Sequence, residues 1–111
     1  MTSLELARQY LRCLVTRDLE GVAKLLADDF RFESPLLRSE SAPAYLANLK
    51  ANPLEPGEAL ILAEVEEGGQ VALFYRYQKE GATLDVAQWF EVSKGKLLAS
   101  RLVFDSSSLK F

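Results

Sequence analysis

The apolar residues of this chain change their spacing once, close to Glu58, and this change limits the possible folds more than any other feature. Before Glu58 most apolar residues recur at the spacing of an amphipathic helix, and after it they alternate with polar residues, as in a strand with one buried face. Helices followed by strands in this order are typical of an α+β domain, in which helices cover one face of an antiparallel sheet.

Capping residues set the limits of the first two predicted helices. Thr2 and Glu5 have the spacing of a capping box, so we expect a first helix over residues 3–16. Asp18 is a suitable N-cap for a second helix. We expect the Asp28-Asp29 pair to close this second helix.

A short strand and a third helix complete the first half of the chain. Phe30, Phe32 and Ser34 alternate with polar residues or a proline, which predicts a strand that ends at Pro35. Ser41 can cap a third helix that carries a proline in its first turn, where the missing N–H costs little.

Glycine-containing turns separate the strands of the second half. We expect strands at residues 58–67, 70–78, 83–92 and 96–105. Turns this short join neighbouring antiparallel strands, so the strands are predicted to form a meander. Because the sequence has no linker or internal repeat, we interpret residues 1–111 as a single domain.

Charge and hydropathy narrow the possible partners. The chain has 111 residues and a formal net charge of −3, without a stripe of basic residues. This charge argues against a protein that neutralises phosphate groups, so nucleic acid is not an expected partner. No window is apolar over the length needed to cross a bilayer, and we therefore expect a cytoplasmic protein with no membrane association.

The residue types of many catalytic and metal sites are scarce. The sequence contains no histidine and a single cysteine, Cys13, which we interpret as a small buried hydrophobe. These counts exclude Ser-His-Asp and Cys-His nucleophiles and the usual zinc sites. Glu64 and Glu66 lie near a hairpin turn and are interpreted as a solvated face. The sequence therefore predicts neither a metal site nor a cofactor.

One polar residue interrupts the inward face of the predicted sheet. Gln88 lies between Val86 and Phe90 on that face, and a buried amide without a partner costs about 1–3 kcal/mol. Two interpretations stay open: Gln88 is hydrogen-bonded inside a packed core, to Tyr10 or to a tyrosine of the sheet, or it lines a ligand cavity. The residues expected inward on the last three strands are Val71, Leu73, Tyr75, Tyr77, Leu84, Val86, Gln88, Phe90, Val92, Leu98, Ser100, Leu102 and Phe104.

The opposite face of the sheet is expected to carry an apolar strip. Phe74, Trp89 and Val103 alternate to this outer face from three adjacent strands. Exposed aromatic residues that gather in this way usually mark an interface, and the commonest partner is a second copy, so we expect a homodimer. The alternative is that the C-terminal residues Leu109 and Phe111 fold back over Trp89.

The run DLEGVAKLLADDFRFESP at residues 18–35, with ARQYLRCLV before it, resembles the opening of the nuclear transport factor 2-like superfamily. This superfamily includes ketosteroid isomerases and SnoaL-like polyketide cyclases. The resemblance implies a cone-shaped, cystatin-like α+β barrel in which three N-terminal helices pack on a curved antiparallel sheet. It also implies a pocket inside the cone. We expect its lining to comprise Tyr10, Phe32, Ser34, Tyr75, Gln88 and Phe104.

The resemblance fails at the position of the catalytic base. Ketosteroid isomerases pair a helix tyrosine and a protonated aspartic acid as an oxyanion hole and use a second aspartate as the base. The corresponding residues here are Tyr10, Gln88 and, at the base, Ser34. An unactivated serine hydroxyl is too weak a base, and the chain has no histidine to assist it. The Asp-Arg-Asp set of limonene-epoxide-hydrolase-like relatives is not predicted either, because the alternation places Arg76 and Arg101 on the outer face.

We therefore expect a small-molecule-binding SnoaL-like domain with an apolar pocket, compatible with weak isomerase, cyclase or hydrolase chemistry but lacking the aspartate base. The sequence leaves open whether the chain is an enzyme. The alternative is a non-catalytic protein-interaction module that dimerises and whose cone is filled. The space between Tyr10 and Gln88 separates the two, because an open cavity favours a ligand site and a filled one favours interaction.

Overall fold

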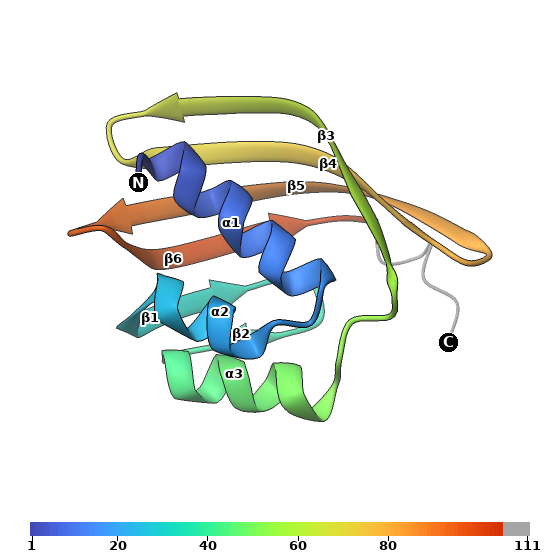
Figure 1. The fold of residues 1–111 in the computed structure, drawn as a ribbon, viewed down its shortest axis with the longest axis horizontal. Coiled ribbons are helices and arrows are strands. Elements are labelled where there is room, and N and C mark those ends of the chain that lie inside the picture. Colours follow the sequence, from blue (N-terminus) through green and yellow to red (C-terminus); the bar gives the residue numbers. More distant parts are fainter. Residues whose placement is uncertain (106–111) are drawn as a thin grey trace.

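The computed structural model describes residues 1–105, and within them three helices and six strands follow one another as shown in Figure 1. The elements are α1 (Ser3–Val15), α2 (Leu19–Leu25), β1 (Leu26–Glu33), β2 (Arg38–Ser39), α3 (Ala42–Ala51), β3 (Gly57–Glu67), β4 (Gln70–Lys79), β5 (Ala82–Ser93) and β6 (Lys96–Val103).

The predicted helix starts are confirmed. The Thr2 hydroxyl accepts a hydrogen bond from the Glu5 N–H, and the Glu5 carboxylate accepts one from the Thr2 N–H, each at 3.1 Å. Asp18 and Ser41 cap α2 and α3 in the same way, each accepting the N–H three residues further along the chain. These side chains satisfy donors that a helix start leaves unpaired, which fixes where each helix begins.

The predicted end of the second helix is wrong. The helix ends at Leu25, and the Asp28-Asp29 pair lies within strand β1. Leu26 already has extended dihedral angles, with φ −93° and ψ 140°, and pairs with Leu97 of β6. Burial of Leu26 against the sheet therefore overrides the helical spacing of the preceding residues.

All strands belong to a single sheet with the order β2-β1-β6-β5-β4-β3 (Figure 1). Strands β3 to β6 form the predicted antiparallel meander. The β3–β4 turn consists of Gly68 and Gly69, whose φ angles of 56° and 79° match a tight hairpin turn. Strand β1 pairs in parallel with β6, and β2 is added at the edge of the sheet. The spacing of apolar residues could not show these two pairings, because it does not specify strand neighbours.

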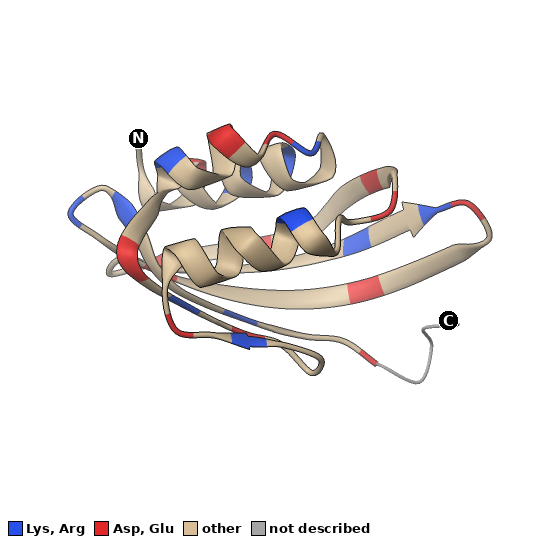
Figure 2. Cartoon of the chain, turned by 90° about the horizontal axis from the view of Figure 1, so that it is seen from below, with Lys and Arg blue, Asp and Glu red and all other residues tan. Residues whose placement is uncertain are grey.

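Helices and sheet form two layers. Figure 2 shows the helices on one side of the curved sheet, with no helix on the other side among the described residues. The core between the layers contains side chains from both, and the largest of those that are almost completely buried are Tyr10, Tyr45, Phe30, Phe90, Leu73, Leu97, Gln88, Val22 and Val71. The α+β cone predicted from the sequence is thus confirmed.

One position on the predicted inner face of β6 is wrong. Leu97 is completely buried, whereas Leu98 is only half-buried. The pairing of β5 with β6 shifts between Glu91 and Val92, so that Val92 pairs with Leu97. This irregularity reverses the alternation at the start of β6, and the predicted alternation resumes at Ser100, which is buried.

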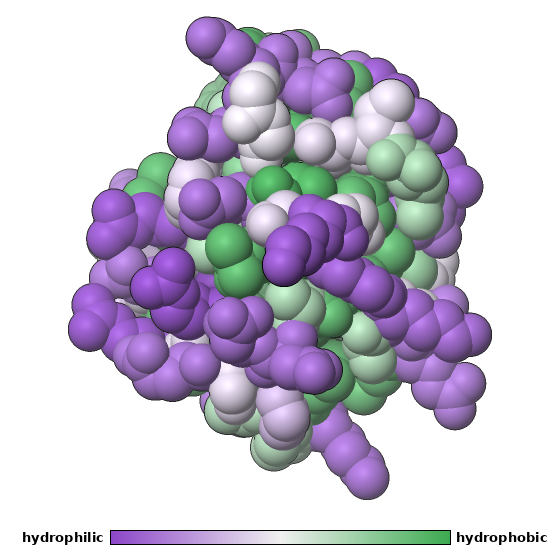
Figure 3. Space-filling model, turned by 90° about the vertical axis from the view of Figure 1, so that its left-hand side faces the viewer, coloured by the Kyte–Doolittle hydropathy of each residue, from purple (hydrophilic) through white to green (hydrophobic). Residues whose placement is uncertain are grey.

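The end of the molecule that carries the β3–β4 and β5–β6 turns is largely hydrophilic, with a smaller hydrophobic area near its middle (Figure 3). No helix within residues 1–105 has the length and apolar character required to cross a membrane.

Candidate functional site

A chain of hydrogen bonds runs through the core from β4 to β6. The Tyr75 hydroxyl donates to Gln88 Oε1 at 2.8 Å, and Gln88 Nε2 donates to Ser100 Oγ at 2.9 Å. The Ser100 hydroxyl donates in turn to the backbone oxygen of Trp89 at 3.0 Å. Gln88, only 2% exposed, is therefore hydrogen-bonded inside the core, as the first of the two interpretations predicted.

Two further tyrosines meet beside this chain. The hydroxyl groups of Tyr10, on α1, and Tyr45, on α3, are in hydrogen-bond contact. The Tyr10 ring packs edge-on against Phe90 with ring centroids 5.3 Å apart, a favourable geometry for two aromatic rings. The contact joins the first helix to the third across the core, so both hydroxyls have a partner without water.

Burial keeps these tyrosines neutral. Desolvation raises the pKa of Tyr10, of Tyr45 and of Tyr75 above the ordinary value, because a buried phenolate loses its hydration. The three hydroxyls are donors at neutral pH, and the interior chain contains no carboxylate. These groups can bind an oxygen atom of another group, but none of them can act as a strong general base.

The structure brings four of the six predicted pocket residues to this region. Tyr10, Tyr75 and Gln88 belong to the polar cluster just described, and the Phe32 ring lies against Tyr45 with centroids 4.6 Å apart. Two polar members were not predicted as site residues, namely Tyr45 and Ser100. For Ser100 the signal was nevertheless present, because the strand alternation placed it inward, and Tyr45 lies on the third helix, which Ser41 was expected to cap.

The other two predicted pocket residues, Ser34 and Phe104, follow strands β1 and β6. Ser34 follows β1 in a turn, where its Oγ accepts the N–H groups of Leu36 at 3.3 Å and Leu37 at 3.1 Å. Its side chain therefore stabilises the turn. Phe104 follows β6 and is partly buried against the edge of the core. Neither residue makes a hydrogen bond or ring contact with the Tyr10–Gln88 cluster among those found in residues 1–105.

Tyr10 and Gln88 are both almost completely buried, and their side chains interact. Every buried side-chain polar atom within residues 1–105 has a hydrogen-bond partner. Four grooves on the described surface are lined by none of Tyr10, Tyr45 and Tyr75, whereas Phe32 and Ser100 line one of them and Gln88 lines another. The cluster is thus a satisfied part of the core in this structure.

The outer face of the sheet differs, because apolar side chains remain in contact with water there. Phe74 is 42% exposed and Val103 is 55% exposed, and both border an apolar hollow of about 280 Å³ on this face. Trp89 lines the same hollow, and its indole N–H donates to Gln70 Oε1 at 3.3 Å. The predicted cover of Trp89 by Leu109 and Phe111 lies outside the described residues.

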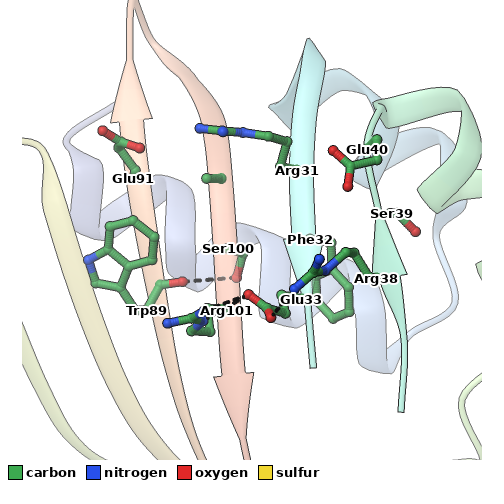
Figure 4. Close-up of a pocket in the computed structure, with 11 residues that line it drawn as sticks. Arg31, Phe32, Glu33, Arg38, Ser39, Glu40, Trp89, Glu91, Ser100 and Arg101 are labelled. Carbon is green, nitrogen blue, oxygen red and sulfur yellow. Dashed lines mark hydrogen bonds and ion pairs between the residues drawn. The ribbon is translucent and has the colours of Figure 1, made fainter. Parts of the chain in front are cut away.

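A larger, more polar groove of about 550 Å³ adjoins this hollow over β1, β2 and β6 (Figure 4). Glu33 lies between two arginines and accepts hydrogen bonds from Arg38 at 2.8 Å and from Arg101 at 2.7 Å. The hydrogen bond from Arg38, followed by that from Arg101, lowers the pKa of the Glu33 carboxyl. Arg101 on the outer face confirms the expected orientation, as does the outer Arg76, which pairs with Asp85 at 2.8 Å.

The described carboxylates make no metal centre. Residues 1–105 contain no group of three or more potential metal ligands. Glu64 instead pairs with Arg8 of α1, and Glu66 accepts the Leu4 N–H at 2.6 Å. Both glutamates therefore tie the first helix to strand β3.

The helices, the curved sheet and the inward tyrosine of α1 define the class of cone-shaped α+β domains to which ketosteroid isomerases belong. Residues 7–99 match the SnoaL-like domain family, and the chain belongs to that family. No curated protein matches the chain.

Solved structures share this fold at low sequence identity. An NTF2-like protein of unknown function from Cytophaga hutchinsonii is 21% identical, with a TM-score of 0.83, 96% of this chain and 93% of that chain covered. An LEH-like epoxide hydrolase from M. tuberculosis is 20% identical, with a TM-score of 0.80 and coverage of 96% of this chain and 84% of that chain. A hypothetical protein from Catenulispora acidiphila with a ketosteroid isomerase-like fold, in complex with trimethylamine, is 14% identical, with a TM-score of 0.77 and coverage of 94% and 88%. At these identities the likeness establishes the fold and leaves the activity open.

Proposed function

We propose that this SnoaL-like domain is a non-catalytic interaction module that associates with a second copy of itself through the outer face of its sheet. The observation that carries the proposal is the exposure of Phe74 and Val103 beside Trp89 on one continuous face. Apolar side chains gathered on a face that no other element of residues 1–105 covers are typical of an interface.

The contents of the interior also support an interaction module over an enzyme. The chain of neutral hydroxyl and amide groups holds no base, and its members satisfy one another. Ser34, at the position of the base in ketosteroid isomerases, is held by the turn that follows β1. An interior whose polar groups are paired with one another and that contains no base favours interaction over catalysis.

The test is to place a charge on the outer face. Phe74→Glu puts a carboxylate where the side chain is already 42% exposed, so the fold tolerates the change while desolvation of the charge opposes association. We expect the dimer dissociation constant to rise at least about 30-fold, as for loss of a central interface residue. Leu36→Glu is the matched control, because Leu36 is also an exposed apolar residue but lies in the turn after β1. Equal effects of the two variants in sedimentation velocity would contradict the proposal.

A second function, binding of a small carbonyl compound inside the cone, is favoured by one observation. Tyr10, Tyr75 and Gln88 gather donor groups within an otherwise apolar core, which is how many ligand sites are built. A ligand would have to replace the Tyr45 hydroxyl as the partner of Tyr10.

Calorimetric titration with a series of apolar cyclic ketones tests this second function. Tyr10→Phe should weaken binding of a responding ketone about tenfold, the value of one hydrogen bond. Tyr77→Phe is the control, because the Tyr77 hydroxyl donates to the backbone oxygen of Glu55 and lies outside the cluster. Absence of binding by the whole series would remove this candidate.

A further inference from the structure

A small groove lies in the helical layer, where the ends of α1 and α3 meet the start of α2. This helix-end groove has a volume of about 200 Å³. No strand contributes to it, and its apolar lining consists of Leu14, Leu19, Leu49, Pro53 and Leu54. The other two lining residues are Arg17 and Lys50. The groove therefore combines an apolar surface with two positive charges, and no carboxylate lines it.

The backbone of Arg17 has a conformation that favours glycine. Its φ angle is 60°, in the left-handed region. The Arg17 N–H donates to the Leu14 oxygen at 3.2 Å and the Asp18 N–H donates to the Cys13 oxygen at 2.8 Å, which is the Schellman pattern that ends a helix. Glycine is the usual residue at this position, because any side chain is strained there. Arg17 therefore occupies a position that the backbone alone would give to glycine.

The side chain of Arg17 is held at one nitrogen only. Its Nε donates to the backbone oxygen of Leu54 at 3.1 Å, which joins the end of α1 to the loop after α3. Within residues 1–105 its two terminal nitrogens have neither a hydrogen bond nor an ion pair. These nitrogens lie side by side in a planar guanidinium, so they can donate together to the two oxygens of a carboxylate.

The acidic residues next to Arg17 and Leu54 in the chain are engaged elsewhere. Asp18 caps α2 by accepting the Gly21 N–H at 2.9 Å, and Glu55 pairs with Lys79 at 2.8 Å. Lys50 has no ion pair or side-chain hydrogen bond within the described part of the chain. The two cations of the groove thus lack an anionic partner from the protein itself.

The volume and the lining restrict the ligand. At about 30 Å³ for each non-hydrogen atom, as for water in the liquid, the groove holds on the order of seven such atoms. An inorganic anion would leave the leucines in contact with water, and an alkane would leave the cations unpaired. A short aliphatic chain that ends in a carboxylate matches both parts of the groove.

We propose that the helix-end groove binds a short-chain fatty acid of about the size of hexanoate. The alkyl chain lies among Leu14, Leu49 and Leu54, and the carboxylate contacts Arg17 and Lys50. This site goes beyond the proposed function, because the groove belongs to the helical layer and the second copy is assigned to the outer face of the sheet.

Titration of the full chain with simple carboxylates, followed by NMR, tests the proposal. Hexanoate should shift the amide signals of Leu14, Leu49 and Leu54 in a saturable way. Butanoate should bind about 15-fold more weakly, at about fourfold for each buried methylene. 1-Hexanol has the same alkyl chain without the charge and should bind at least about tenfold more weakly than hexanoate.

Substitution of Arg17 tests the carboxylate contact. Arg17→Gly suits the left-handed backbone, so the fold should persist, and affinity for hexanoate should fall at least about tenfold. Arg17→Lys retains the charge and should recover part of this loss. Lys94→Gly is the matched control, because Lys94 also has a positive φ, 52°, but lies in the β5–β6 turn. This control should bind hexanoate as the unchanged protein does.

Three results would overturn the proposal. They are the absence of saturable shifts with hexanoate, equal binding of hexanoate and 1-hexanol, and equal loss of affinity in Arg17→Gly and Lys94→Gly. None of them bears on the dimer, whose mass is measured without ligand.

Discussion

The interior of the cone and the outer face of the sheet differ in whether their side chains have partners within the chain. Inside, Tyr10, Tyr75 and Gln88 are buried, and their polar atoms have partners within the chain. Outside, Phe74 and Val103 keep large apolar areas in water. The same strands supply both faces, since side chains alternate across each strand.

The polar groups of the interior are thus paired within the chain, whereas the apolar side chains of the outer face remain free to contact a partner. A polar cluster whose members satisfy one another gains little from a ligand, because the ligand must first break existing hydrogen bonds. Burial of an exposed apolar face by a partner is favourable by about 25 cal/mol per Å² of apolar area, before the costs of association are subtracted. The outer face is therefore where this domain has most to gain by binding.

Truncation of one aromatic side chain on each face should give the largest contrast. Phe90→Ala removes a fully buried ring that packs against Tyr10 and should lower the free energy of unfolding by about 3–5 kcal/mol. Phe74→Ala should cost less than about 1 kcal/mol in dilute solution, where the dimer has dissociated. Urea denaturation at low protein concentration measures both values. Similar losses would mean that the two faces are not distinct in this way.

Gln88→Leu tests whether the interior is packed. The change leaves the buried Tyr75 hydroxyl without its acceptor, so we expect a loss of about 1–3 kcal/mol in the free energy of unfolding. Adding Tyr75→Phe removes the orphaned hydroxyl and should recover part of this loss, which a double-mutant cycle would quantify. A loss below about 1 kcal/mol for Gln88→Leu would instead indicate that water reaches Tyr75, as in an open ligand cavity.

The variant Ser34→Asp tests whether an aspartate at the position of the base gives the domain isomerase activity. An aspartate at this position can accept the same N–H groups of Leu36 and Leu37, so stability should change by less than about 0.5 kcal/mol. Because the hydroxyl and amide groups of the Tyr10–Gln88 cluster are paired with one another and Ser34 lies in a turn outside it, we expect neither the variant nor the unchanged protein to isomerise a β,γ-unsaturated ketone in an absorbance assay. Activity that appears only with the aspartate would show that substrate enters the cone and that a base was the missing part.

The smallest effect is expected from acid, through the exposed ion pairs that border the two faces. Hydrogen bonding from Arg8 lowers the pKa of the Glu64 carboxyl, so the unfolded chain takes up this proton more readily than the folded one. The stabilisation is complete above the unfolded pKa, about 4.3, and is lost as the pH falls through the lower folded pKa. Glu64→Gln should thus reduce the difference in stability between pH 7 and pH 3, measured by urea denaturation. An unchanged difference would mean that this exposed pair contributes nothing.

The sequence predicts the positions of the helices and strands better than it predicts which strands pair with one another. Local signals determine the caps at Thr2, Asp18 and Ser41 and the four strands of the meander, because each acts over a few residues. The early end of α2 and the burial of Leu97 depend on contacts between β1, β5 and β6, which no local pattern contains.

The candidate site residues also differ in how far local patterns predict their positions. The inward positions of Tyr10, Tyr75 and Gln88 follow from helical and strand periodicity, and the structure brings these three residues together. The role of Ser34 depends on how the chain turns after β1. The contact between Tyr45 and Tyr10 depends on where α3 packs. The cytoplasmic location and the homodimer remain predictions.

Sedimentation equilibrium of the unchanged chain over a wide concentration range tests the central claim most directly. The protomer has a mass of 12.4 kDa. If the outer face is an interface, the mass should approach twice this value as the concentration rises, and Phe74→Glu should return it to that of the protomer. A single mass equal to that of the protomer up to the highest concentration would contradict the claim that this face binds a second copy.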